Sequence, residues 1–317
     1  MAGVFSLILK RIGSAALILF LVSLIVFAIS SLLPGDAASE MLGQSATPEA
    51  VAALRAQLGL NEPAHLRYLH WLVGLLTGNP GHSLANNMPV AALIAGRLPK
   101  SLILAAFAAG VSAPMAVSLG IAAAVKPGSA LDRALSLTAL SMVAVPEFLV
   151  ATLGVLAFAV KLQWLPSITL IPEHPTIWQF VRGYILPVMT LSFVVTAQMA
   201  RMTRAAVIDQ LRQPYSEMAR LKGLGPARVV IAHALPNAAG PIANAVALSL
   251  SYLLGGAIIV ETIFNYPGVA SLMVDAVTSR DMPLLQTCAM IFCAGYLLLV
   301  LAADICAILA NPRLRRG

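Results

Sequence analysis

Two carboxylates interrupt long apolar stretches and are the first residues in the sequence that could do chemistry. Glu147 follows Pro146 within residues 134–160, and Asp304 lies within residues 284–310. A carboxylate is costly in a lipid bilayer, so it marks a functional site by default. Glu147 stands about 20 Å of helical rise into its stretch, and Pro146 can kink the helix there. Glu147 is therefore expected either to face a passage and favour positively charged amines, or to be a protonated or paired structural acid.

The other reactive side chains do not form a recognisable site. Asp304 is expected to pair with arginines at the cytoplasmic end or to make a helix-end contact. No metal site is expected, because the histidines lack ligand spacing and the cysteines lie together in one apolar stretch, as buried small hydrophobes do. These residues are His65, His70, His82, His174, His233, Cys288, Cys293 and Cys306.

The chain also lacks the sequence signatures of an enzyme. No Gly-x-Ser-x-Gly nucleophile motif occurs, and no Gly-x-x-x-x-Gly-Lys-Ser/Thr phosphate-binding loop is present. We therefore expect a chain that catalyses no reaction and holds no cofactor of its own.

Composition identifies the environment in which the chain folds. The 317 residues are 59% hydrophobic and 10% charged, with a mean hydropathy of +0.88, whereas soluble domains carry about 25% charge. Because backbone groups in lipid must be paired within the chain, the spans should be helices. The net charge of +7 indicates basic cytoplasmic loops and not a nucleic-acid partner.

The apolar stretches are long enough to cross a bilayer six times, since each crossing needs about 20 residues. The expected fold is an all-α polytopic membrane protein with six transmembrane helices. They lie at 12–33, 101–125, 134–160, about 185–200, about 237–260 and about 284–310.

Charge predicts how the spans are oriented. Most of the 20 Lys and Arg residues lie in the N-terminal tail, in 126–133, in 201–236 and at the C-terminus. The acids in these segments are Asp132, Asp209 and Glu217. The positive-inside rule therefore places both termini in the cytoplasm. Arg201 and Arg204 are expected to anchor the inner end of the fourth span at the headgroups.

Two segments outside the spans divide the chain. Residues 1–100 are expected to hold the first span and an extracytoplasmic loop with short helices at 48–58 and 63–76, each opened by a proline. Residues 101–317 are expected to form a five-helix core with a cytoplasmic loop at about 201–236. We find no internal repeat of the kind that marks many secondary transporters.

The cytoplasmic loop carries a helix with a marked end. Tyr215 to Lys222 favours a helix, Gly223 suits its C-terminus, and Pro226 can open a second helix. Tyr215, Met218, Ala219 and Lys222 recur at helical spacing and share a face. This face either docks on another protein or packs only on its own bundle.

The loop resembles the "EAA" loop of ABC-importer permeases. Glu217-Met-Ala219, three residues, Gly223, nine residues and His233-Ala-Leu235-Pro236 follow the pattern E-A-A-x3-G-x9-I-x-L-P, with Met218 and His233 as departures. The rest of the chain is similar to the first permease subunit of dipeptide, oligopeptide and nickel importers. Its matches in order are Leu33-Pro-Gly-Asp36, Leu58-Gly-Leu60, Pro63, Tyr68, Trp71, Gly81-His-Ser83, Gly255-Gly-Ala257, Glu261-Thr-Ile-Phe264, Pro267-Gly268, Arg280-Asp-Met-Pro283 and Asn311-Pro-Arg313.

The resemblance implies a mechanism and a set of partners. The loop helix would couple to an ATPase subunit through Tyr215, Glu217, Met218, Ala219, Arg220, Lys222 and Gly223. Two ATPase subunits would bind ATP and Mg, a second homologous permease would complete the pathway, and an extracytoplasmic binding protein would deliver substrate. The chain would lie in a bacterial inner membrane and drive uptake, most simply of di- or oligopeptides, by alternating access.

The outer end of the fifth span could also line the pathway. Glu261, Phe264, Pro267 and Gly268 either form an outer gate or make ordinary interfacial packing. Alternative substrates within the family are nickel complexes, glutathione, opines and sugars. A stand-alone secondary transporter is the alternative from another class.

Overall fold

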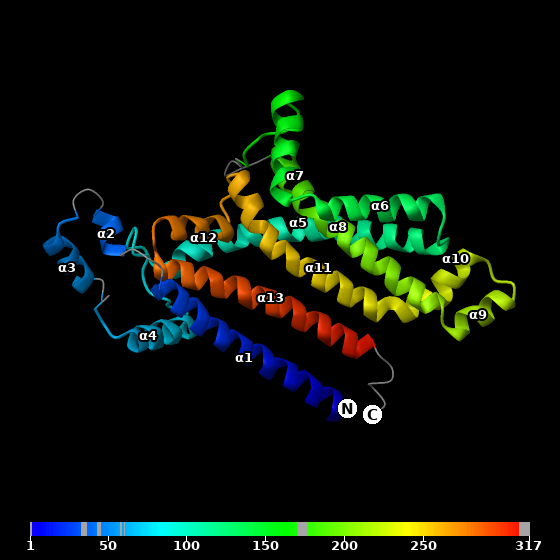
Figure 1. The fold of residues 1–317 in the computed structure, drawn as a ribbon, viewed down its shortest axis with the longest axis horizontal. Helices are drawn as coiled ribbons and strands as arrows, with labels where there is room; N and C mark the ends of the chain where they lie inside the picture. The colour runs from blue at the N-terminus through cyan, green and yellow to red at the C-terminus, as the bar shows by residue number, and fades with distance from the viewer. Residues whose placement is uncertain are drawn as a thin grey trace. The chain divides into compact units, whose positions relative to one another are not determined.

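The computed structural model describes residues 2–32, 37–42, 46–57, 59, 61–169 and 176–310, and their regular structure is helical (Figure 1). Within these ranges an isolated antiparallel bridge joins His82 and Pro89. Several residues singled out in the sequence lie outside the described ones. They are the Leu33-Pro-Gly-Asp36 motif, Leu58, Leu60, His174, and the chain end with Asn311, Arg313, Arg315 and Arg316.

The helices differ widely in length, from 4 residues in α10 to 36 in α5. In chain order they are α1 Ala2–Leu32, α2 Ala37–Leu42, α3 Pro48–Gln57, α4 Ala64–Thr77, α5 Val90–Val125, α6 Ala130–Ala144, α7 Glu147–Gly154, the π-helical η2 Val155–Lys161, α8 Ile177–Leu211, α9 Pro214–Leu221, α10 Pro226–Val229, the π-helical η3 Val230–Ala234, α11 Leu235–Ile263, α12 Val269–Thr278 and α13 Met282–Ala310.

Five helices are long and apolar enough to cross a membrane, and a bent pair makes a sixth candidate. Most extend beyond the apolar stretches because hydrogen bonding continues until a cap ends the helix. The helix that holds the fourth span begins at Ile177 instead of about 185, since Thr176 and Gln179 form a reciprocal capping box there.

The predicted third span is broken at Pro146. α6 ends at Ala144, α7 begins at Glu147, and the pair is bent by 96°. Pro146 has no N–H, and the residue before a proline disfavours helical backbone. Val145 accordingly adopts an extended conformation.

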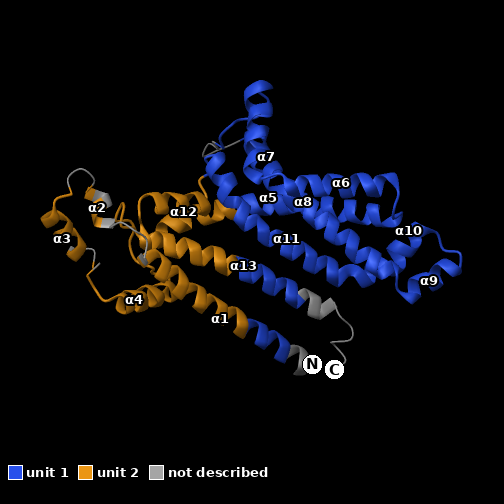
Figure 2. Ribbon diagram, viewed as in Figure 1, with its two compact units in different colours: residues 1–12, 103–266, 296–317 blue, residues 13–102, 267–295 orange. Residues whose placement is uncertain are grey.

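The described chain divides into two compact units (Figure 2). Unit 1 comprises residues 1–12, 103–266 and 296–317, and unit 2 comprises residues 13–102 and 267–295. Unit 1 contains the bent pair, α8, α9 and α11.

Helix α8 is the most enclosed of the candidate spans. Its apolar window is 61% buried, compared with 6% for the first span. Leu191, Val195 and Met199 on α8 pack in one apolar cluster with Leu253 and Val260 of α11. This helix therefore forms the centre of unit 1.

Gly120 allows α5 to approach α8 closely. A Cβ atom at position 120 would lie 2.6 Å from the Ala200 carbonyl oxygen and 2.7 Å from Thr203 Cβ. No side chain fits at that separation, so the two backbones can meet only because residue 120 is glycine.

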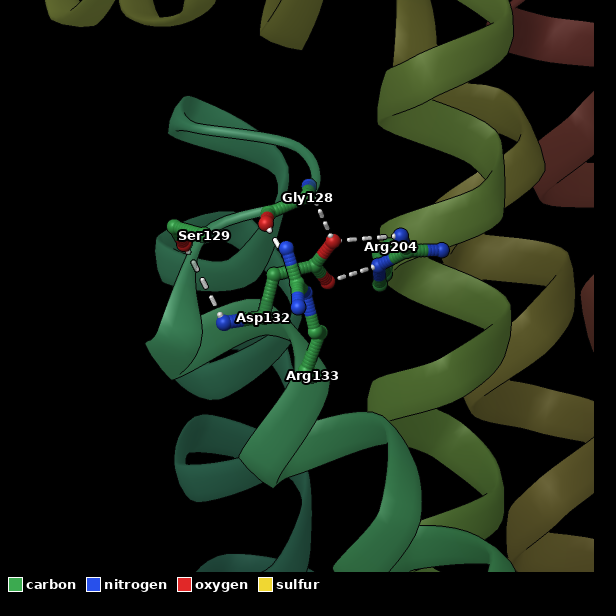
Figure 3. Close-up of polar contacts among 5 residues, drawn as sticks. All are labelled: Gly128, Ser129, Asp132, Arg133 and Arg204. Atoms are coloured by element: carbon green, nitrogen blue, oxygen red, sulfur yellow. Dashed lines mark hydrogen bonds and ion pairs between the residues drawn. The ribbon is translucent and has the colours of Figure 1, made fainter.

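A buried ion pair joins α6 to α8 (Figure 3). The Arg204 guanidinium donates from Nε to Asp132 Oδ1 and from Nη2 to Oδ2, the second at 2.7 Å. Gly128 N–H also donates to Oδ2 at 2.8 Å, and Ser129 caps α6 through Asp132 N–H. Arg204 is therefore not a free headgroup anchor as the sequence suggested, because its fork geometry matches a carboxylate from the neighbouring helix.

Unit 2 holds the two predicted outer-loop helices, α3 and α4. Helix α4 packs on the first span, where the Tyr68 and Ser23 hydroxyls lie 2.9 Å apart and Phe27 contacts Trp71. Asp281 accepts hydrogen bonds from Ser83 and from the N–H of Leu284, which ties the segment after α4 to the start of α13.

Replacing Gly120 with alanine should separate α5 from α8. We expect Gly120→Ala to lower the unfolding free energy by about 1–3 kcal/mol, as overpacking does, and to lower the unfolding temperature of the purified protein. Gly110→Ala on the same helix is the matched control, because nothing lies within 4 Å of its Cβ position. Equal stability of the two variants would contradict the close approach.

Removing the Asp132 charge should leave Arg204 without its partner. We expect Asp132→Asn to cost about 3 kcal/mol in unfolding in mixed micelles. Asp304→Asn is the control, because its partner Arg11 is 58% exposed and an exposed pair contributes about 0–1 kcal/mol. A loss as small as that of the control would show that the buried pair does not stabilise the bundle.

Candidate functional site

A short helix, α9, projects between the ends of α8 and α11 (Figure 1). Pro214 occupies its first turn and Gly223 its C-terminal turn, with φ +83°. Gly223 N–H donates to Arg220 O and Leu224 N–H donates to Ala219 O, at 2.8 and 3.3 Å. These two bonds form a Schellman motif, which confirms the predicted helix end at Gly223.

The two faces of α9 differ in burial. Ser216 and Ala219 face the bundle, and Ser216 Oγ donates to Gln210 O at 2.8 Å. Tyr215, Met218 and Leu221 are 38%, 59% and 78% exposed. The described bundle thus leaves an apolar face of α9 open to solvent.

The structure changes which residues make up the expected docking face. Ala219 lies on the buried side, 5% exposed, where its small side chain lets α9 approach Val229 and Val230. Leu221 replaces it on the open side, and its position three residues after Met218, one turn along the helix, was the signal for it. Glu217, Arg220, Lys222 and Gly223 are exposed, as a docking surface requires.

The chain after α9 forms one long helical path. Pro226 opens α10, as the sequence predicts, and the helix continues through η3 into α11 over residues 226–263. His233 lies in η3, and its carbonyl oxygen accepts from Asn237 Nδ2 at 2.8 Å. No group of metal-binding side chains occurs among the described residues.

Unit 1 also contains a cavity of about 500 Å³, and Glu147 lines it. Glu147 is the first residue of α7, directly after the bend at Pro146. The walls come from α6, α7, α8 and α11, and their lining residues include Leu191, Val194, Val195, Gln198, Arg201, Ser249, Tyr252, Leu253, Gly255 and Gly256.

Gly256 makes room for the Glu147 carboxylate. A Cβ atom at position 256 would lie 2.8 Å from Glu147 Oε2 and would overlap Oε1 as well. Gly255, the preceding residue, has nothing within 4 Å of its Cβ position. The glycine pair expected from the family pattern therefore has one member that faces Glu147.

The cavity contains polar atoms without partners inside the described chain. No described residue donates a hydrogen bond to the Glu147 carboxylate or forms an ion pair with it. Ser249 Oγ has no hydrogen-bond partner either, but it is fully buried and out of reach of a group in the cavity. The unpaired Glu147 carboxylate is costly in an apolar interior unless another group pairs with it, as a polar substrate would.

The residues proposed for an outer gate are placed differently. Glu261 and Phe264 are 0% exposed at the end of α11, and Phe264 O accepts from Thr169 N–H at 2.9 Å. The hydroxyl groups of Tyr266 and Tyr184 lie 2.9 Å apart. Burial is the main cause that raises the pKa of Tyr266, and the hydrogen bond with Tyr184 is the second. Neither Glu261 nor Phe264 lines the Glu147 cavity.

Pro267 and Gly268 belong to unit 2, where Gly268 precedes α12. Their positions are therefore given only relative to other residues of unit 2. Asp304 pairs with Arg11 at 3.0 Å, which confirms the structural interpretation of this acid.

Comparison with known proteins places these features in a family. A family model described as binding-protein-dependent transport system inner membrane component matches residues 116–316, and a model of its N-terminal part matches residues 4–105. A probable peptide ABC transporter permease of Sinorhizobium fredii is 36% identical over 97% of this chain and 98% of its own.

Two further relatives are similar over nearly their whole length. A glutathione transport system permease of Salmonella typhimurium is 35% identical over 97% of this chain and 98% of its own. A putative peptide transport system permease of Brucella abortus is 34% identical over 98% of this chain and 99% of its own. The chain therefore belongs to the family of binding-protein-dependent transport system inner membrane components, and it is a non-catalytic permease subunit of a bacterial ABC importer that works with a binding protein and ATPase partners.

Proposed function

We propose that this permease imports di- or oligopeptides by alternating access. The relatives named for peptide transport support this substrate class, and so does the relative named for glutathione, itself a small peptide. The single observation that carries the proposal is the cavity with the unpaired Glu147 carboxylate, since every unblocked peptide has a positive amine to offer it.

In this proposal α9 is the coupling helix. Its open face, formed by Tyr215, Met218 and Leu221, would lie in a groove of an ATPase subunit, with Glu217, Arg220, Lys222 and Gly223 around it. Exposed apolar side chains on a soluble loop are costly unless a partner covers them. ATP and Mg would bind to the two ATPase subunits, and the permease would receive their motion.

Rigid connections support transmission from α9 to the cavity. The Ser216–Gln210 bond joins α9 to α8, and the buried Ala219 side joins it to the start of α11. Both α8 and α11 contribute walls to the Glu147 cavity. A displacement of α9 would therefore reach the cavity through two packed helices, which deform little.

The remaining parts of the proposal concern the pathway and the membrane topology. A second homologous permease would complete the pore, and Glu147 would lie along the path. Both termini and α9 would lie in the cytoplasm. Residues 1–100 would supply the first span and the outer loop, and residues 101–317 would supply the permease core.

Purification of the chain followed by uptake assays distinguishes our proposal from two alternatives. Uptake of a nickel complex, an opine or a sugar, with no uptake of peptides, would place the chain elsewhere in the same family. Uptake by the isolated chain without ATPase partners would indicate a stand-alone secondary transporter. Our proposal requires co-purification with ATPases and peptide uptake that depends on ATP.

Gly223→Val should uncouple ATP hydrolysis from uptake. Valine at φ +83° is strained, so the turn that ends α9 should reorganise. We expect normal membrane insertion and continued ATP hydrolysis, with peptide uptake reduced at least about tenfold, a barrier change of roughly 1.4 kcal/mol. Gly225→Ala is the control, because Gly225 has φ −65° and open space at its Cβ position. Normal uptake by Gly223→Val would refute the coupling role.

Gly256→Ala should change transport through Glu147 without unfolding the bundle. The new methyl group would meet the end of a flexible side chain, so the carboxylate should move instead of the helix. We expect the apparent KM for a peptide to rise by about tenfold, the value of one charge-assisted hydrogen bond. Gly255→Ala should leave KM and thermal stability unchanged. If Gly256→Ala and Gly255→Ala behaved alike, the position of the Glu147 carboxylate would be unimportant for transport.

A further inference from the structure

The cavity of unit 1 lies between two antiparallel helices. Leu191 and Val195 of α8 cluster with Leu253 and Val260 of α11. Val207 and Leu211, further along α8, cluster instead with Ala238 and Ile242, nearer the start of α11. The two helices therefore run in opposite directions along the cavity, as Figure 1 also shows.

This arrangement separates an acid from a base. Arg201 lies on α8 between Val195 and Val207, so it lies beside α11 between Ile242 and Leu253. Glu147 lies against Gly256, beyond Leu253. The carboxylate and the guanidinium therefore line opposite ends of the same cavity.

Both charged groups are available to a ligand. Glu147 has no donor among the described residues. Arg201 donates from Nη2 to Gln198 Oε1 at 2.8 Å and forms no ion pair within the described chain. A guanidinium carries five N–H donors in a planar fork, so most of them are left for a carboxylate.

The α11 wall of the cavity has the length of a short peptide. Ser249 and Gly256 are seven residues apart on α11, which is about 10 Å of helix rise. Three extended residues span about 10 Å. The Tyr252 side chain lies along this length, while Leu191 and Val194 supply apolar wall.

We infer that this cavity is a binding station for zwitterionic short peptides, in which Glu147 receives the terminal ammonium and Arg201 receives the terminal carboxylate. The inference rests on the proposed function and adds a recognition rule to it. A cation alone would leave Arg201 unpaired, and an anion alone would leave Glu147 unpaired. A peptide with both termini free pairs both.

The test measures protection of a cysteine in the cavity of the assembled complex. Val194→Cys supplies the reporter, in a chain whose Cys288, Cys293 and Cys306 are replaced by alanine. N-ethylmaleimide labelling is followed in nanodiscs that contain both permeases and the ATPases but no binding protein. The probes are tri-alanine, N-acetyl-tri-alanine and tri-alanine amide, each at millimolar concentration.

We expect tri-alanine to slow labelling, and each blocked form to need about tenfold more peptide for equal protection, since each loses one charge-assisted bond. Glu147→Gln should abolish the difference between tri-alanine and its N-acetyl form. Arg201→Gln should abolish the difference between tri-alanine and its amide. Asp275→Asn, at an exposed acid of α12, should change neither comparison.

Equal protection by the free and blocked peptides, or no protection, would overturn the zwitterion site. The blocked-peptide comparison on the unsubstituted cavity gives this answer even if a charge variant fails to assemble. ATP-dependent uptake of tri-alanine, measured with the binding protein added, distinguishes failure of the binding station from failure of the proposed function. Uptake without differential protection rejects only the station, whereas an absence of peptide uptake rejects the proposed function on which it rests.

Discussion

The structure depends on the need of every backbone N–H and C=O in an apolar layer to find its partner within the chain. Long uninterrupted helices satisfy that need in five candidate spans. The remaining candidate span departs from it at Val145-Pro146, where the chain turns by 96°. Glu147 follows the turn directly and lines the cavity. The polar site thus occurs where the helical rule is broken, because a break is tolerated only beside protein or water.

Helix α8 connects the features that matter for transport. It meets α5 at Gly120, donates hydrogen bonds to the Asp132 carboxylate through Arg204 and contributes Arg201 to the cavity. Its C-terminal end bonds to α9 through Gln210. Its central position in unit 1 explains why it can make all these contacts, since its apolar window is the most buried of the candidate spans. An importer subunit needs such an element between an energy-receiving loop and a substrate cavity.

Much of the candidate site could be predicted from residue types alone. The end of α9 at Gly223 and the start of α10 at Pro226 follow from backbone preferences, which act locally. Glu147 stood out because a carboxylate in an apolar stretch is rare. Ala219 and Leu221 were harder, since helical spacing gives the relative angle of two side chains but not which angle meets the bundle. Arg204 was assigned to the headgroups because its partner, Asp132, lies on another helix 72 residues away in the chain.

The sequence by itself determined the membrane class, the helical fold, the approximate spans and the family of the loop, because hydropathy, caps and spacing are properties of neighbouring residues. Only the tertiary structure decided that Gly256 makes room for Glu147, that Arg201 lies at the far end of the same cavity and that Ser249 is left without a partner there. These facts depend on α7, α8 and α11 packing together. Local preferences cannot specify such contacts, since they arise from the complementary shapes of surfaces far apart in the chain.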